Sequence, residues 1–165
     1  MKQQVERTVI DTIVGPLTIG ADKTHIRFVA FSGEDDAERS ITGAPVSPVL
    51  REACSQLEHY FKGDRRTFDL PLRMAGTEFQ KRVWLALGEI EFGHVLSYGE
   101  LARRLGNPHL ARAVGQAANK NPLPIIIPCH RLVGSGGWLG GFAPGVELKR
   151  VLLGHEGVHP PHQNG

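Results

Sequence analysis

The stretch Ile126-Ile127-Pro128-Cys129-His130-Arg131-Leu132-Val133 says most about how this chain folds and reacts. The β-branched run before Pro128 predicts a buried strand that ends at the thiol of Cys129. The thiolate is the reactive form of cysteine, and cations such as those of His130 and Arg131 lower a thiol pKa. The pattern therefore favours a reactive cysteine, although buried cysteines are usually inert small hydrophobic residues.

The residues after this stretch predict a close-fitting loop and a final helix. The run 134–141 is rich in glycine, which reaches unusual dihedral angles and lets the backbone line a pocket closely. Pro144 then precedes a helix predicted over 146–153, and His155 and Glu156 follow that helix.

Upstream of the stretch, two short helices are predicted. The first covers 98–105 and begins at a capping box formed by Ser97 and Glu100. The second covers 107–120 and begins with Asn-Pro, a cap followed by a proline in the first turn. Together they form a helix-turn-helix pattern, which also occurs in ordinary helical proteins.

The second of these helices is rich in alanine and glycine, including Ala113 and Gly115. Small residues let a helix backbone approach a partner closely, whether that partner is a nucleic-acid groove or another helix. Arg112 lies off the apolar stripe and is a candidate phosphate or base contact, although a solvated arginine fits the periodicity equally well.

The N-terminal part predicts a small β-rich α/β unit. Strands are expected at 5–14, 17–19, 25–31 and 67–72, a loop at 32–47 and a helix at 48–61. We place a domain boundary near residue 75. Past it, Thr77 and Gln80 form a capping box for a helix whose inward residues are Phe79, Val83, Trp84 and Leu87. The fold class is therefore α+β, with an N-terminal α/β support domain (1–75) and a mostly helical C-terminal domain (76–165) that contains the helix-turn-helix.

Composition limits the classes of protein. The 165 residues are 41% hydrophobic and 22% charged, as in soluble globular proteins. Residues 76–165 carry nine Lys and Arg against six Asp and Glu, which permits a polyanionic partner without requiring one. Two cysteines, no apolar signal core and no membrane-length run predict a reducing, cytoplasmic location. We expect no structural metal and no cofactor, because the histidines lack ligand-like spacing.

Five motifs in order resemble the O6-alkylguanine-DNA alkyltransferases, also called methylated-DNA–protein-cysteine methyltransferases, over about residues 77–157. They are Thr-x-Phe-Gln-x-x-Val-Trp at 77–84, Ser-Tyr-Gly-Glu-Leu-Ala at 97–102, Ala-Arg-Ala-Val-Gly at 111–115, Asn-Pro-x-Pro-Ile-x-Ile-Pro-Cys-His-Arg at 121–131, and Leu-Leu-x-His-Glu at 152–156. Residues 1–75 match the family's variable N-terminal domain only in size and β-rich character.

This resemblance implies a DNA repair protein that moves an alkyl group from guanine O6 onto its own Cys129. The product would be a thioether with no easy reversal, so each molecule would act once. The resemblance makes His130, working with a water, the base for the thiol, and it makes Glu156 the group that orients and charge-balances His130. Asn121 would fix the backbone turn near the site.

The resemblance also implies a guanine pocket. Tyr98 would donate to the guanine ring and help to turn its phosphate. Main-chain groups of Cys129 and Leu132 would accept from the guanine amino group, and the N–H of Ala143 would donate to O6.

Two positions in the pocket loop depart from the family pattern. Phe142 stands where many relatives have tyrosine, and Pro144 stands where many have glycine. Because proline stiffens the chain and removes a donor, we expect poor tolerance of bulky O6 adducts such as benzyl.

The expected partner is double-stranded DNA carrying O6-alkylguanine, with no membrane involved and with cooperative self-association on DNA as a further expectation. Because O6 lies inside the base stack, the base must flip into a pocket. The resemblance gives Arg112 the role of filling the vacated stack. It places the helix with Ala113 and Gly115 in the minor groove, whose hydrogen-bond code is degenerate.

Two other functions compete with this one. A cysteine hydrolase built on Cys129 and His130 would turn over many times, but no clear oxyanion motif is present. A helix-turn-helix regulator without chemistry would need polar base-reading side chains, and residues 109–118 are mostly alanine and glycine.

Overall fold

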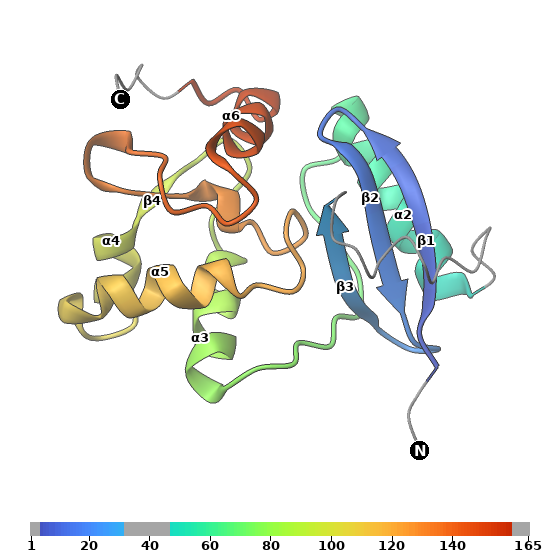
Figure 1. Ribbon diagram of the computed structural model, residues 1–165, viewed down its shortest axis with the longest axis horizontal. Coiled ribbons are helices and arrows are strands. Elements are labelled where there is room, and N and C mark those ends of the chain that lie inside the picture. The colour runs from blue at the N-terminus through green and yellow to red at the C-terminus, as the bar shows by residue number, and fades with distance from the viewer. Residues whose placement is uncertain (1–3, 32–46, 160–165) are drawn as a thin grey trace. The chain divides into compact units, whose positions relative to one another are not determined.

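The protein has an α+β fold that divides into two compact units, residues Met1–Met74 and Ala75–Gly165. The computed structural model describes residues 4–31 and 47–159. A small antiparallel sheet with a helix makes up the first unit, and short helices dominate the second (Figure 1). This confirms the predicted fold class.

Three strands in the order β1-β2-β3 form the sheet of the first unit. They are β1 (Glu6–Thr12), β2 (Gly15–Ala21) and β3 (Ile26–Phe31), and both pairs are antiparallel. Helix α2 (Pro48–Lys62) packs against this sheet; its N-terminus is capped by Ser47, and Gly63 ends it in the left-handed region at φ 88°. The helix buries Ala53, Cys54, Leu57 and Tyr60 against the strands.

The strand predicted at 67–72 is absent; in this segment Leu72 makes only a single bridge, to Ile26. The loop predicted at 32–47 lies outside the described residues except for its last position.

The second unit alternates short helices with loops. Its elements are α3 (Glu78–Leu87), β4 (Leu96–Ser97), α4 (Tyr98–Arg104), η1 (Pro108–Leu110), α5 (Ala111–Asn119), η2 (Cys129–Arg131), β5 (Leu132–Val133), η3 (Ser135–Gly137) and α6 (Val146–His155), where η denotes a 3₁₀ turn. The capping box of α3 is present as predicted, with Thr77 and Gln80 bonded in both directions. The indole of Trp84 donates to the carbonyl of Ala117 over 2.9 Å and so ties α3 to α5.

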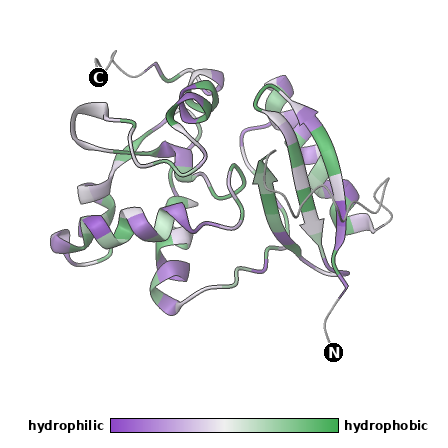
Figure 2. Ribbon diagram, viewed as in Figure 1, coloured by the Kyte–Doolittle hydropathy of each residue, from purple (hydrophilic) through white to green (hydrophobic). Residues whose placement is uncertain are grey.

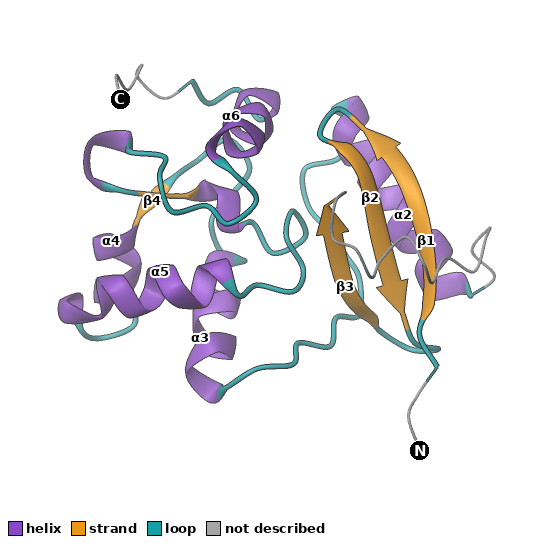
Figure 3. Cartoon of the chain, in the orientation of Figure 1, coloured by secondary structure: helices purple, strands orange, loops and turns teal. Residues whose placement is uncertain are grey.

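The strand predicted before Cys129 is absent. In Figure 3 the chain that leaves the C-terminal end of α5 is drawn as loop. Pro122, Pro124 and Pro128 remove backbone donors at short intervals, so this segment cannot form a regular ladder. It is nevertheless buried, and it is coloured mainly hydrophobic in Figure 2. The strand comes after the cysteine instead, where β5 pairs in parallel with β4.

Helix boundaries also differ from the prediction. Asn107 caps the second predicted helix by accepting from the N–H of His109, but the first turn is the 3₁₀ turn η1 before α5 begins. In α4, Ser97 accepts from the N–H of Glu100 as predicted, whereas the Glu100 carboxylate pairs with Arg103. Among the described residues, no helix has both the length and the apolar character needed to cross a membrane.

Candidate active site

Cys129 is the first residue of η2, and its thiol lies in the interior with 8% of the residue exposed. Burial raises the pKa of the Cys129 thiol, while hydrogen bonding to Asn121 and the charge of Lys149 act in the opposite direction. We expected neighbouring cations to lower this pKa, and the structure contradicts that expectation. The thiol is therefore protonated at rest and needs a base before it can react.

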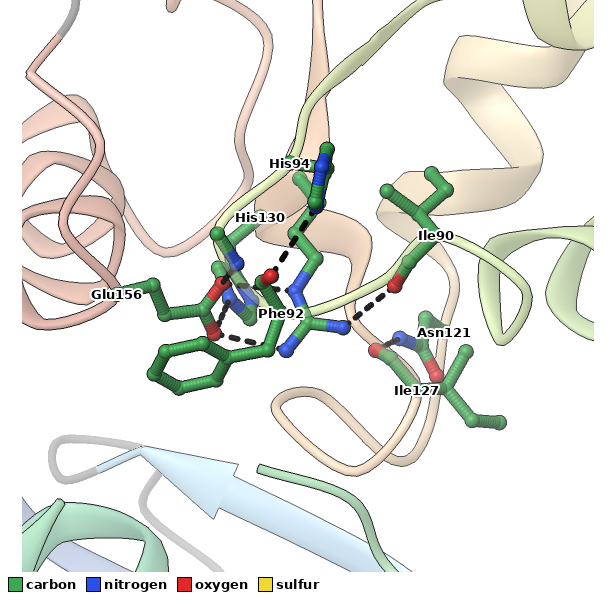
Figure 4. Close-up of polar contacts among 9 residues, drawn as sticks. Ile90, Phe92, His94, Asn121, Ile127, His130 and Glu156 are labelled. Atoms are coloured by element: carbon green, nitrogen blue, oxygen red, sulfur yellow. Dashed lines mark hydrogen bonds and ion pairs between the residues drawn. The ribbon is translucent and has the colours of Figure 1, made fainter. Parts of the chain in front are cut away.

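His130 and Arg131, which directly follow Cys129 in sequence, form a buried cluster with Glu156 (Figure 4). Glu156 caps the C-terminal end of α6, and its carboxylate accepts from His130 Nε2 at 2.8 Å. The Arg131 guanidinium donates to the same carboxylate in a bidentate pair of 2.8 and 2.9 Å. Arg131 also donates to the Ile90 carbonyl at 2.6 Å, so its guanidinium is held by both Glu156 and Ile90.

These contacts determine which nitrogen of His130 can act as a base. Burial lowers the pKa of His130, although the adjacent Glu156 carboxylate opposes this, so the ring is neutral near pH 7. The carboxylate paired with Arg131 can only accept, so Nε2 carries the ring proton. Among the described residues, Nδ1 is a buried ring nitrogen without a hydrogen-bond partner. His130 thus keeps a free lone pair at Nδ1 in the interior.

Asn121 holds the turn that leads to the cysteine. Its Nδ2 donates to the Ile127 carbonyl at 2.8 Å, and its Oδ1 accepts from the Leu123 N–H at 2.9 Å. Between them, Ile125 has a φ of 75°, a conformation that β-branched residues rarely adopt. Such strain costs about 1–3 kcal/mol and persists only where the surroundings enforce it, as the two Asn121 bonds do here.

Sequence reasoning missed Lys149, which is 1% exposed in the core of this unit. Its Nζ donates to the Leu132 carbonyl at 2.5 Å and lies 5.6 Å from the centre of the Phe142 ring. Burial lowers the pKa of Lys149 to about 8. A signal was available: Lys149, Leu152, Leu153 and Glu156 follow the i, i+3, i+4, i+7 spacing of a buried helix face.

Tyr98, the first residue of α4, contacts both the glycine-rich loop and α5. Its hydroxyl donates to the Gly140 carbonyl at 3.3 Å, and burial raises the pKa of Tyr98. A Cβ on Gly115 would lie 3.3 Å from the Tyr98 ring, so the glycine lets α5 approach Tyr98 closely. Phe142 is buried, and the Leu132 carbonyl that we assigned to guanine already accepts from Lys149.

The remaining predicted residues lie nearer the surface. The Ala143 N–H, which we assigned to guanine O6, donates to Asn119 Oδ1 at 3.1 Å. On α5, Arg112 is exposed and Ala113 is half-buried. Within residues 4–31 and 47–159 no three His, Cys, Asp or Glu side chains cluster as metal ligands would. The arrangement offers a buried thiol, a neutral imidazole oriented by a carboxylate, and a loop rich in backbone donors and acceptors.

Comparison with curated proteins finds relatives along nearly the whole chain. It is 43% identical over 150 residues to the methylated-DNA–protein-cysteine methyltransferase of Methanosarcina acetivorans, covering 90% of this chain and 96% of the relative. It is 41% identical over 156 residues to the constitutive methylated-DNA–protein-cysteine methyltransferase of Bacillus subtilis, with 92% and 94% covered.

Solved structures agree. The O6-methylguanine methyltransferase of Mycobacterium tuberculosis matches with a TM-score of 0.83 and 37% identity over 97% of each chain. A crystal structure of the enzyme of that organism in complex with DNA matches with a TM-score of 0.81 and 39% identity over 92% of each chain. Residues 5–74 match the family model for the ribonuclease-like domain of 6-O-methylguanine DNA methyltransferase, and residues 78–158 match the model for its DNA-binding domain. These matches confirm the resemblance carried by the five motifs: the chain belongs to the methylated-DNA–protein-cysteine methyltransferase family.

Proposed function

We propose that this protein repairs DNA by transferring the alkyl group of O6-alkylguanine to the sulfur of its own Cys129. One observation carries the proposal: His130 is held at Nε2 by Glu156 and keeps a buried, unpartnered Nδ1, next in sequence to a buried thiol. A base that is neutral and oriented in this way suits removal of the thiol proton, either directly or through a water.

The chemical step is a displacement at the alkyl carbon. The Cys129 proton passes to His130 Nδ1, the thiolate attacks the carbon, a C–S bond forms and the C–O6 bond breaks. The electron pair of the broken bond goes to the guanine ring, which takes up the proton that His130 received, either directly or through a water, and leaves as ordinary guanine. The protein keeps a thioether, so one molecule repairs one lesion.

The pocket groups act on the leaving base. The Tyr98 hydroxyl donates to the guanine ring, and the Ala143 N–H donates to O6 as negative charge develops there, which makes guanine a better leaving group. Carbonyls of Cys129 and Leu132 accept from the guanine amino group, and Lys149 holds the Leu132 carbonyl in place. Phe142 forms part of the apolar wall.

DNA binding is proposed to use α4 and α5 as a helix-turn-helix, with α5 in the minor groove. Ala113 and Gly115 keep this helix narrow, and the exposed Arg112 occupies the space left when the lesion flips out. Residues 1–75 act as a support domain.

Binding of the protein to undamaged duplexes of increasing length tests self-association on DNA. Cooperative binding would make the binding isotherms steeper as the duplex becomes longer.

Mass spectrometry tests the chemistry. After mixing with an O6-methylguanine duplex, we expect one methyl group per protein, located on the peptide that contains Cys129, and none on a Cys129→Ser variant that still binds DNA. Methyl transfer to Cys54, or clearance of several lesions by one molecule, would overturn the proposal.

A second experiment tests the role of Arg112. Arg112→Ala should slow transfer from duplex DNA and leave transfer from the free O6-methylguanine base unchanged. The matched control is Arg51→Ala, an exposed arginine of α2, which should change neither rate. Equal slowing with both substrates would mean that Arg112 supports the structure of the pocket and does not act through a contact with DNA.

A further inference from the structure

The two donors that the proposed function gives to guanine are both hydrogen bonded within the free protein. The Ala143 N–H donates to Asn119 Oδ1 at 3.1 Å, and the Tyr98 hydroxyl donates to the Gly140 carbonyl at 3.3 Å. Asn119 is the last residue of α5, so its side chain joins the proposed DNA-binding helix to the pocket loop. Guanine therefore has to replace existing bonds when it enters.

We propose that Asn119 is a further residue of the guanine pocket, one that competes with guanine O6 for the N–H of Ala143. The inference rests on the proposed function, because it takes Ala143 as the donor to O6. An N–H held at hydrogen-bond distance by one oxygen must release it before it can bond well to another, so Asn119 Oδ1 stands where O6 has to bind.

The competition changes along the reaction. Before transfer, O6 is an aryl ether oxygen and accepts hydrogen bonds less well than the amide oxygen of Asn119. As the C–O6 bond breaks, negative charge develops on O6, and an acceptor with charge forms the stronger bond. The exchange from Asn119 to O6 is thus driven mainly by the transition state, and the bond to Asn119 slows entry of the base.

The exposure of both partners sets the size of the effect. Asn119 and Ala143 are exposed, so Asn119 can turn into water and meet its own hydrogen-bonding needs there. The free energy that opposes bonding of guanine O6 to the Ala143 N–H is then only the net free energy of one solvent-exposed hydrogen bond. This corresponds to a change in rate of about 2- to 10-fold.

Substitutions at Asn119 should change the rate in opposite directions. The probe is the free O6-methylguanine base with a labelled methyl group, which is neutral and lacks phosphates. Asn119→Ala removes the competing acceptor and should raise the second-order rate of methyl transfer by about 2- to 10-fold. Asn119→Asp supplies a charged, stronger acceptor and should lower that rate by a similar factor.

Gln116 supplies matched controls. It is exposed on α5 one turn before Asn119, so Gln116→Ala and Gln116→Asp report changes in helix propensity and charge alone. We expect both controls to stay within twofold of wild type. Slower transfer by Asn119→Ala would mean that Asn119 positions the N–H for O6, and rates within twofold of wild type for both Asn119 variants would mean that it plays no part; either result overturns the proposal.

A second readout needs no substrate. Amide hydrogen exchange at Ala143, followed by NMR, should be faster in Asn119→Ala than in wild type, and unchanged exchange would refute the hydrogen bond in solution. Failure of the proposed function looks different: the wild type would then methylate itself with neither the free base nor duplex DNA, while the exchange result at Ala143 would stand.

Discussion

Replacing Glu156 by glutamine tests the buried cluster with the smallest change in shape. The carboxylate is inside the protein and accepts from three side-chain donors, one on His130 and two on Arg131, at 2.8 to 2.9 Å, and from the Gly93 N–H at 3.4 Å. Glutamine offers one accepting oxygen and an NH₂ group that can only donate. In either orientation of the new side-chain amide, a donor confronts a donor, and the buried guanidinium of Arg131 loses its counter-charge.

Both stability and rate should fall. Removing one partner of a buried ion pair costs about 3–5 kcal/mol, because the remaining charge is left without compensation. If the new NH₂ faces His130, Nε2 must become the acceptor and the ring proton moves to Nδ1, so the free lone pair is lost. A correctly protonated general base contributes roughly 10²- to 10⁴-fold, so alkyl transfer by Glu156→Gln should slow by a factor in that range.

Urea unfolding gives the free-energy change, and single-turnover transfer from an O6-methylguanine duplex gives the rate, at a temperature where circular dichroism shows the variant folded. Glu147→Gln is the control: Glu147 lies in the first turn of the same helix with 88% of its side chain exposed. It should stay within about 0.5 kcal/mol of wild type. A Glu156→Gln protein that loses less than about 1 kcal/mol, or that transfers at the wild-type rate, would refute the role assigned to Glu156.

Three other perturbations probe the same interior. Lys149→Met removes the cation that favours the thiolate, so single-turnover rates should fall and their pH profile should move upward. Since burial lowers the pKa of Lys149 to about 8, the unfolded chain holds more protons on this side chain above that pH, so the wild type should gain stability in urea relative to Lys149→Met as the pH rises from about 8 to 9. Burial also lowers the pKa of His130, so on acidification the unfolded chain binds a proton first; stability should fall below about pH 6.5, with a shallower fall for His130→Gln. Asn121→Ala should cost about 1–3 kcal/mol in urea unfolding, because the Leu123 N–H and Ile127 carbonyl lose their partner, and an unchanged midpoint would contradict this.

Helix starts could be predicted because they depend on local chemistry. Ser47, Thr77 and Ser97 each accept a backbone N–H within the first turn of the helix that they precede. The strand predicted before Cys129 failed because β-branched composition indicates burial as much as strand. Three prolines within seven residues remove the donors that a strand needs, and this burial is achieved by a loop held by Asn121.

The motifs identified His130 and Glu156, but not the direction in which the thiol pKa shifts. Adjacent cations in the sequence suggested a lowered pKa, whereas Arg131 turns to Glu156 and Ile90, contacts that are 25 and 41 residues away in sequence. The helical spacing could have predicted that Lys149 is buried, but not which group it binds. Lys149 and Asn119 each bond a backbone group distant in sequence, the Leu132 carbonyl and the Ala143 N–H, and no local pattern specifies which group that will be.

Burial shifts the pKa values of the Cys129 thiol and of His130 in opposite directions, and on the proposed mechanism this keeps the site unreactive until a lesion binds. It raises the pKa of the Cys129 thiol and lowers that of His130, so both are neutral in the resting protein, and an ion pair between them is disfavoured. On the proposed mechanism the product is also neutral at sulfur, because the proton leaves with guanine. Separated charge at the site is then needed only while the alkyl group moves, when Lys149 and the donors around O6 stabilise it. The same buried environment therefore protects the thiol from other electrophiles and still allows its single reaction with the alkyl group of the lesion.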